Sequence, residues 1–480
     1  MATTDLIYRT ALDLAGAIRR REVSAEEVVQ AHLARIEQVD GRLNAVVTRC
    51  QEQALERARQ ADVALANGRL WGPLHGVPIT VKDSYATAGI RTTSGHPPFA
   101  DHIPDWDATP VARLLQAGAV LLGKTNMPPL GLNYQCDNEL FGRTDNPWAP
   151  DRTPGGSSGG SAAALAAGMV PLELGGDFAG SARVPAHYSG VFAVKPTEFL
   201  VSGGPHPDFR TIRHMSQPSP MARSVEDLGI ALRLIAGPDG HSRETPPVSL
   251  PEPPPRDLAT YSLAWMMELP GAPPAAAIKN AMQRLADGLA QVGCPVQERR
   301  PAGWAFAPLM ETWAELGYAE IGAGMDDETR LDFSRQLQLA PDQEDALLRG
   351  AYRGLTADNR AMAQTLARRD QYATALDHLF DEVDVLLMPT AMTTAIPHWP
   401  TGQPIPVDGR PETYWTVGLA YTTPCNLTGH PVVTCPMGLA DDGLPVGIQI
   451  VGRRWGDGDL LAFVQRLAQF VGPLQHPPLA

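Results

Sequence analysis

The sequence is poor in cysteine and has no long apolar run, and each shortage excludes a class of protein. Its five cysteines are odd in number, widely scattered and free of any CxxC pair, so they predict neither a disulfide framework nor a zinc site. No run approaches the roughly 20 apolar residues that a membrane-spanning helix needs. The N-terminal segment shows no basic stretch followed by an apolar core, and we therefore expect a cytoplasmic protein.

Positive charge is also scarce. The chain has 39 lysines and arginines against 53 aspartates and glutamates, a formal net charge of -14. Nucleic acids and anionic membranes bind basic patches, so this balance argues against both as partners. With 480 residues, 44% of them hydrophobic and 19% charged, the chain is expected to form a globular protein with a large core.

Helical and strand patterns alternate along the chain without a clear break. The first seventy residues are expected to be helical, with Ser24 and Glu27 at the spacing of a capping box. Strands are predicted at 77–81, 119–122, 383–388, 432–437 and 446–451, the last two as a hairpin. Helices are predicted at 161–169, 223–236 and 459–471 and repeatedly within 275–385, and 245–255 is a proline-rich connector. This mixture predicts an α/β fold: one domain with a central mixed, twisted sheet flanked by helices on both faces.

The segment GVPITVKD, residues 76–83, places a lysine at the end of an apolar strand. A strand-end lysine ordinarily reaches solvent while its stem covers apolar neighbours. If the strand instead carries Lys82 inward, burial would lower the pKa of its amine towards the value of about 7–8 that suits a general base. The strand by itself leaves both interpretations open.

Residues 154–185 are rich in glycine and serine and lead directly into the alanine-rich segment at 161–169. A flexible linker has such a composition, but a linker has no reason to run into a helix. Residues 155–159 also match G-x-S-x-G, the nucleophile elbow of a serine esterase, with Ser157 as the nucleophile. That motif requires a strand immediately before it, whereas residues 142–153 are polar and contain two prolines, so the esterase is the weaker alternative.

A second glycine-rich turn, GGDFAGS at residues 175–181, ends in Ser181. Its successive N–H groups form a candidate anion-binding nest. A serine at such a turn suits acyl transfer, because neighbouring amides can hold the oxyanion, each contributing about 3–4 kcal/mol. Histidine is the usual base, but neither His75 nor His187 fits a recognisable triad order, and no HExxH motif occurs.

Three motifs taken together resemble the amidase signature family. They are Lys82 in the context Val-Lys-Asp, Gly-Gly-Ser-Ser-Gly-Gly-Ser at 155–161, and Asp-x-x-Gly-Ser-x-Arg-x-Pro at 177–185. Supporting matches are GKTNMP at 123–128, KPT at 195–197, PMARS at 220–224 and GLPVG at 443–447. The resemblance implies a single amidase-signature domain over residues 1–480. Its core motifs lie at about 70–235 and 380–470, and a variable helical region at about 256–380 contributes to the substrate pocket.

The resemblance also implies a Ser–cis-Ser–Lys triad. Ser181 would be the nucleophile, Ser157 would follow a cis peptide bond and pass a proton, and Lys82 would be the base. The amides of Phe178, Ala179 and Gly180, with that of Ser181 itself, would form the oxyanion hole. Asp177 and Arg183 resemble a supporting ion pair, and Ser158 a structural residue.

The activity implied is hydrolysis of the carbon–nitrogen bond of a small non-peptide amide through an acyl-enzyme on Ser181, with esters and carbamates (urethanes) as further candidate substrates. No metal and no organic cofactor is implied. The expected partner is the amide or carbamate substrate, and a homodimer is compatible with the sequence.

Two positions depart from the usual family pattern. Ala179 stands where a glycine is usual, as in relatives such as the cyclic nylon-oligomer hydrolases, and Pro129 replaces an acidic residue at the pocket edge. Some family members are the A-type components of amidotransferases, which work with partner proteins. This chain lacks their Asp-Thr-Gly-Gly-Ser stretch, and its acidic balance does not favour contact with tRNA, so that function is a second alternative.

Overall fold

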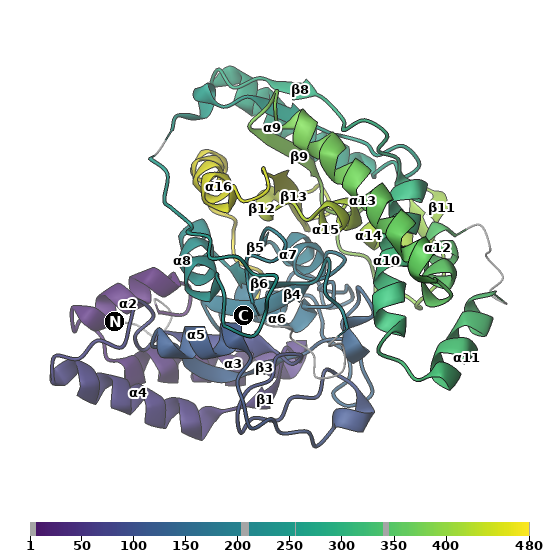
Figure 1. Ribbon diagram of the computed structural model, residues 1–480. Coiled ribbons are helices and arrows are strands. Elements are labelled where there is room, and N and C mark those ends of the chain that lie inside the picture. Colours follow the sequence, from purple (N-terminus) through teal and green to yellow (C-terminus); the bar gives the residue numbers. More distant parts are fainter. Residues whose placement is uncertain (1–5, 203–210, 255, 339–344, 480) are drawn as a thin grey trace.

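Within the described part of the chain, eleven strands form one mixed sheet in the order β1-β3-β2-β4-β6-β5-β12-β13-β9-β7-β8. The structure is a computed structural model that describes residues 6–202, 211–254, 256–338 and 345–479 (Figure 1). Strand β2 pairs in parallel with β3 and β4, and β7 pairs in parallel with β8 and β9, whereas the remaining pairs are antiparallel. The predicted α/β fold with a mixed sheet is therefore confirmed. The strands are β1 (Val46–Arg49), β2 (Pro78–Lys82), β3 (Val120–Thr125), β4 (Leu172–Asp177), β5 (Phe192–Lys195), β6 (Gln217–Ala222), β7 (Leu263–Trp265), β8 (Val296–Glu298), β9 (Val385–Pro389), β12 (Val432–Leu439) and β13 (Pro445–Val451), while β10 (Ile405–Val407) and β11 (Arg410–Glu412) form a separate two-stranded sheet.

The helices lie mostly where the sequence predicts them. The capping box at Ser24 and Glu27 is present, and the predicted hairpin is the antiparallel pair β12–β13. The predicted connector has no helix or strand over residues 245–254, and Pro255 lies outside the described residues. The helices are α2 (Ala11–Arg19), α3 (Ala25–Leu43), α4 (Gln51–Ala66), α5 (Thr109–Gln116), α6 (Gly159–Ala166), α7 (Arg183–Ser189), α8 (Val225–Ile235), α9 (Ala276–Gln291), α10 (Phe306–Gly322), α11 (Asp327–Gln338), α12 (Ala346–Leu355), α13 (Asn359–Leu379), α14 (Tyr414–Leu419), α15 (Thr423–Thr428) and α16 (Asp457–Val471).

Helices cover both faces of the sheet, because successive side chains of a strand point to opposite sides. In β9, Val385 and Leu387 belong to one hydrophobic cluster, which includes residues of α5, α8 and α16. Leu386 and Met388 belong to another, which includes residues of α10 and α13. A third cluster combines α3 and α6 with strands β1 and β3. The sheet is thus buried on both sides, which fits its largely apolar strands.

Three strands lie where the sequence indicates something else. Strand β1 interrupts the segment expected to be helical, and β7 and β8 come from the region expected to be only helical. In that region α10 to α13 lie together at one side of the molecule (Figure 1).

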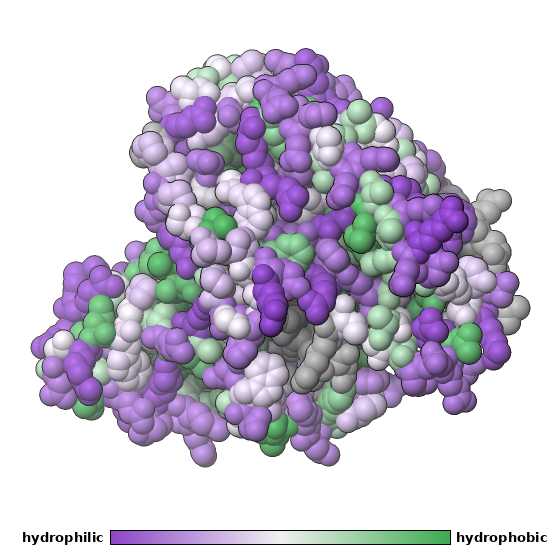
Figure 2. All heavy atoms as spheres, viewed as in Figure 1, coloured by the Kyte–Doolittle hydropathy of each residue, from purple (hydrophilic) through white to green (hydrophobic). Residues whose placement is uncertain are grey.

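Hydrophilic residues cover most of the face seen in Figure 2, and hydrophobic residues are scattered over it in small groups. Within the described ranges, no helix is both long enough and apolar enough to cross a membrane.

Candidate active site

Strand β2 turns Lys82 into the protein. Ile79 and Val81 pack into the cluster that includes α5, α8 and α16, so Thr80 and Lys82 face the other side of the sheet, where α6 packs. The Lys82 side chain is buried, with 3% of the residue exposed. Its Nζ donates a hydrogen bond to Ser157 Oγ over 2.6 Å. Of the two interpretations of this lysine, the structure supports the buried amine.

The environment of Lys82 disfavours its charged form. Burial lowers the pKa of the Lys82 ammonium to about 7, although Cys136, Asp177 and Glu173 act in the opposite direction. At neutral pH a large fraction of this amine is therefore uncharged, as acceptance of a proton requires.

The loop before α6 carries Ser157 to this amine. The Gly156–Ser157 peptide bond is cis, as the resemblance implied, and Ser157 is 2% exposed. Ser158 has a different environment: its N–H donates to the Ser181 carbonyl over 2.9 Å and its Oγ contacts the backbone of Gly176. Ser158 thus joins this loop to the second glycine-rich turn, which agrees with the structural role expected for it.

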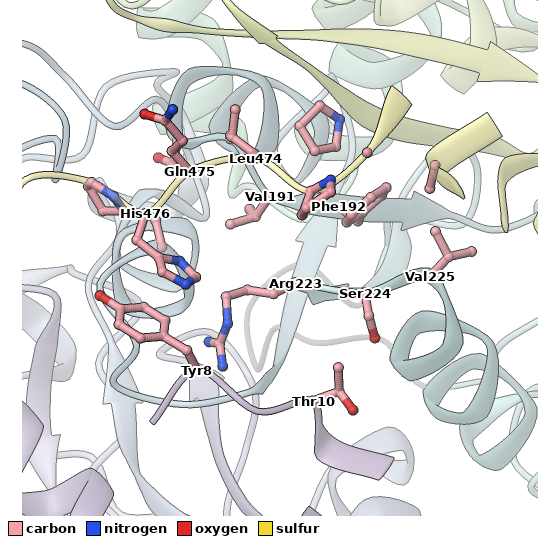
Figure 3. A pocket seen from close by; sticks show the side chains of 18 of the residues that line it. Tyr8, Thr10, Val191, Phe192, Arg223, Ser224, Val225, Leu474, Gln475 and His476 are labelled. Atoms are coloured by element: carbon pink, nitrogen blue, oxygen red, sulfur yellow. The ribbon is translucent and has the colours of Figure 1, made fainter. Parts of the chain in front are cut away.

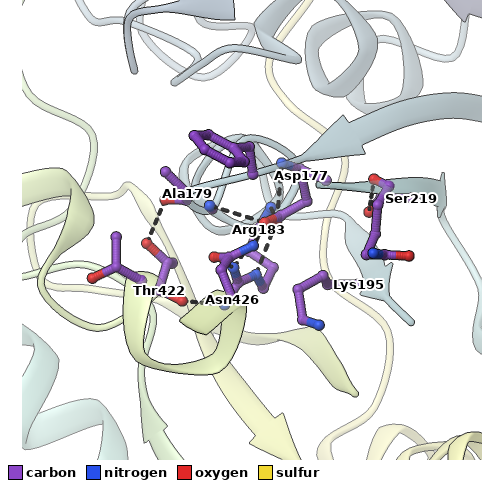
Figure 4. A network of polar contacts seen from close by, with 12 residues as sticks. Asp177, Ala179, Arg183, Lys195, Ser219, Thr422 and Asn426 are labelled. Carbon is purple, nitrogen blue, oxygen red and sulfur yellow. Dashed lines mark hydrogen bonds and ion pairs between the residues drawn. The ribbon is translucent and has the colours of Figure 1, made fainter. Parts of the chain in front are cut away.

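Ser181 lies in the turn that follows β4. A buried ion pair between Asp177 and Arg183 supports this turn (Figure 4). Arg183 Nη2 and Nε donate to the two carboxylate oxygens of Asp177 over 2.8 and 2.9 Å, and Asn426 donates to the same carboxylate. Burial alone raises the pKa of the Asp177 carboxyl, but the charge and hydrogen bonds of Arg183 outweigh it and hold that pKa well below its usual range. The pair is therefore charged and fixes the start of α7.

Four backbone amides lie in the turn at residues 178–181, and one of them, that of Gly180, is occupied. The Gly180 N–H donates to Asp177 Oδ1 over 2.9 Å, so Gly180 is not a free oxyanion donor, and its predicted role needs revision. Its φ of +102° and a contact of 2.5 Å between an added Cβ and Thr422 Oγ1 explain why glycine stands there. In the part of the chain that the structure describes, the amides of Phe178, Ala179 and Ser181 have no acceptor.

A pocket opens at Lys82, Ser157 and Ser181, and its other described walls are mostly apolar. Gly131 lies against Ser157, where an added Cβ would be 3.2 Å from the serine Oγ. Of the apolar residues that line the pocket, the sequence indicated Phe178 alone. Pro129, which departs from the family pattern, is the neighbour of another lining residue, Leu130. The apolar lining residues are Leu130, Leu132, Phe178, Ile212 and Ile321.

The other candidates from the sequence have structural surroundings. No strand precedes Ser157 within residues 142–156, so the strand–turn–helix context of an esterase elbow is missing. His187 accepts from the Gly447 N–H at Nδ1 and contacts the Thr393 carbonyl at Nε2, and burial lowers its pKa to about 4. His75 likewise contacts backbone groups through both ring nitrogens. Among the described residues, no group of histidine, cysteine and carboxylate side chains is arranged to hold a metal ion.

A separate pocket lies where the start of the chain meets its end (Figure 3). Tyr8 stacks on His476 there, and Arg223 donates to four backbone carbonyls beside them. None of Lys82, Ser157 and Ser181 lines this pocket.

Comparisons with known proteins identify the family of the chain. A family model described as Amidase matches residues 27–461. The chain is 34% identical to the A component of a glutamyl-tRNA(Gln) amidotransferase from Moorella thermoacetica, covering 95% of each chain. It is 33% identical to an indoleacetamide hydrolase from Bradyrhizobium diazoefficiens, covering 97% of this chain and 87% of that one. A structure of 6-aminohexanoate cyclic dimer hydrolase with its substrate is 26% identical, with a TM-score of 0.80 over 98% of this chain and 99% of that one. The chain belongs to the amidase signature family and is a hydrolase of carbon–nitrogen bonds.

Proposed function

We propose that this chain hydrolyses a small, uncharged amide through an acyl-enzyme on Ser181. The observation that carries the proposal is the buried contact of 2.6 Å between Lys82 Nζ and Ser157 Oγ, in a pocket that Ser181 also lines. A neutral amine can accept the Ser157 proton over this distance, and Ser157 can then take the proton of Ser181. Two hydroxyls and one desolvated amine thus replace the histidine that most serine hydrolases use.

In the proposed reaction, Ser181 Oγ attacks the substrate carbonyl as its proton passes through Ser157 to Lys82. The tetrahedral oxyanion is held by the amides of Phe178, Ala179 and Ser181, each contributing about 3–4 kcal/mol. The proton returns through Ser157 to the leaving nitrogen, and the amine departs. Water then attacks the acyl-enzyme by the same relay and releases the acid and free Ser181.

The described pocket lining favours uncharged acyl groups. Apart from the catalytic Lys82 and the paired Asp177, the described lining residues carry no charge. A free amino-acid amide brings an ammonium group, whose transfer into such surroundings is costly without a partner. We therefore expect aliphatic amides and anilides to exceed amino-acid amides in kcat/KM. Aryl carbamates and esters complete the panel, because their carbonyls are open to the same attack.

The test of the nucleophile is Ser181→Ala together with covalent labelling by a serine-directed phosphonate. We expect Ser181→Ala to lose turnover and labelling, while Ser334→Ala, a buried serine in α11, retains both. Mass spectrometry of the labelled wild-type peptide should place the phosphonate on Ser181. A label on Ser157 would favour the esterase alternative, and full activity of Ser181→Ala would refute the proposal.

A second candidate function is that of an amidotransferase component of the A type. The 34% identity to such a protein over 95% of the chain favours it. The two functions differ in what the isolated chain can do. If the purified chain alone hydrolyses simple amides, the stand-alone amidase is supported; if it turns over only with partner proteins and their substrate, the amidotransferase is supported.

A further inference from the structure

Glu173 is a buried carboxyl group beside the proposed catalytic groups that the reaction scheme does not use. It lies in β4, with 1% of the residue exposed, and is the register partner of Thr80 in β2. Leu172 and Leu174 on either side of it pack into the cluster on the opposite face. Glu173 therefore points to the same face of the sheet as Lys82, towards α6.

Three hydroxyl groups converge on the Glu173 carboxylate, and each comes from a different element. Thr80 of β2 donates to Oε2, in a close contact, while Thr125 of β3 and Ser161 of α6 each donate to Oε1 over 2.7 Å. Thr80 precedes Lys82 by two residues, and Thr125 is the register partner of Lys82. Ser161 lies in the first turn of the helix that follows Ser157.

We propose that Glu173 is a positioning residue of the active site, whose carboxylate holds the strand that carries Lys82 against β3 and against the helix that follows Ser157. The inference rests on the proposed function, since it concerns the same lysine–serine contact. A carboxylate suits this place because it only accepts hydrogen bonds, and three hydroxyls are there to donate.

The charge of Glu173 also acts on Lys82. Cys136, Asp177 and Glu173 are the groups whose charges act on Lys82 and raise the pKa of its amine. Asp177 is neutralised by its bidentate pair with Arg183, whereas the hydrogen bonds of Glu173 come from uncharged hydroxyls. Lys124 is the cation that lowers the pKa of Glu173, although burial dominates and raises that pKa to about 7. Glu173 thus stabilises the protonated form of Lys82.

The test is the pH profile of kcat/KM for Glu173→Gln, which keeps the shape of the side chain and removes its charge. The acidic limb, which reports the proton on Lys82 in the free enzyme, should move to lower pH. Glu173 and Lys82 are two residues along a strand and one strand spacing apart, which is about 8 Å. At an effective dielectric constant of about 20, loss of a full charge at this distance shifts the limb by up to about 1.5 pH units. The plateau should fall roughly ten- to a hundredfold, because the lysine–serine geometry loosens.

Asp227→Asn is the matched control. Asp227 is a buried carboxylate of α8 that accepts from the backbone N–H groups of Ala11 and Leu12, so its replacement changes stability and not the active site. The acidic limb of the kcat/KM profile of Asp227→Asn should coincide with that of the wild-type protein. If Glu173→Gln leaves the limb in place and lowers only stability, Glu173 is merely structural and the inference is overturned.

Ser161→Ala gives an independent variant if Glu173→Gln does not fold. It removes one of the three donors that favour the charged form of Glu173, so the carboxyl group carries less negative charge. The acidic limb should then move in the same direction by a smaller amount; an unmoved limb would contradict the inference. These outcomes differ from failure of the proposed function, which would appear as full activity in Ser181→Ala whatever the behaviour of Glu173.

Discussion

Replacing Lys82 by methionine should stabilise the folded protein at neutral pH while it abolishes activity. The folded state holds Lys82 with a pKa lowered to about 7 by burial, whereas in the unfolded chain a lysine titrates near its ordinary value of about 10.4. Between these two values the unfolded chain binds more protons than the folded protein. The free energy of unfolding must therefore rise with pH across this window, and the lysine costs stability below it.

The size of the effect follows from the two pKa values. At pH 7 the difference of about 3.4 units, with Lys82 half titrated in the folded state, costs about 4 kcal/mol. Methionine removes this cost and fills a similar volume. It also removes the hydrogen bond to Ser157, which is worth about 1 kcal/mol. We therefore expect the free energy of unfolding of Lys82→Met to exceed that of the wild-type protein by about 3 kcal/mol at pH 7. The advantage should vanish near pH 10 and reverse above it.

The assay is chemical denaturation of both proteins at pH 7, 8, 9 and 10. The difference between them should shrink by about 1.4 kcal/mol per pH unit between pH 8 and 9, and by less near either pKa. The wild-type kcat/KM should rise with pH through about 7, as Lys82 loses its proton. A stability difference that does not depend on pH would show that Lys82 keeps its charge in the folded protein, and the proposed base would fail.

Two further substitutions test the turn that holds Ser181. Gly180→Ala should reduce kcat at least a hundredfold, because its φ is +102° and the new Cβ would meet Thr422 Oγ1 at 2.5 Å. Gly438→Ala is the control, because Gly438 has a φ of +110° but no atom lies within 4 Å of an added Cβ. This variant carries the backbone strain without the steric contact, so it should lower only stability. Equal kinetics in the two variants would contradict the role given to the contact with Thr422. Arg183→Met should cost about 3–5 kcal/mol in a denaturation experiment, because it leaves the Asp177 carboxylate buried without its cation; a loss below about 1 kcal/mol would show that the pair is dispensable.

Strand β6 contradicts the rule that proline is rare inside a sheet, and its pairing gives the physical reason. Strand β6, with Pro218 and Pro220, lies between β4 and β5, although proline is ordinarily confined to edges. Its pairing with β5 is limited to Met221 and Ala222, so both prolines are paired on one side only. That arrangement depends on how far β5, which continues to Lys195, stays paired with β6, and the sequence of β6 cannot show this.

The sequence by itself determined the pattern of the chain: apolar strands, capped helices, and the three motifs that carry Lys82, Ser157 and Ser181. These features are local, since each depends on residues a few positions apart. Tertiary structure alone decided that Lys82 points inward to Ser157, that the Gly180 amide is occupied by Asp177, and that Glu173 accepts hydroxyls from β2, β3 and α6. Each of these contacts depends on strand register and burial, because a change of one residue in register would turn the same side chains to the opposite face of the sheet.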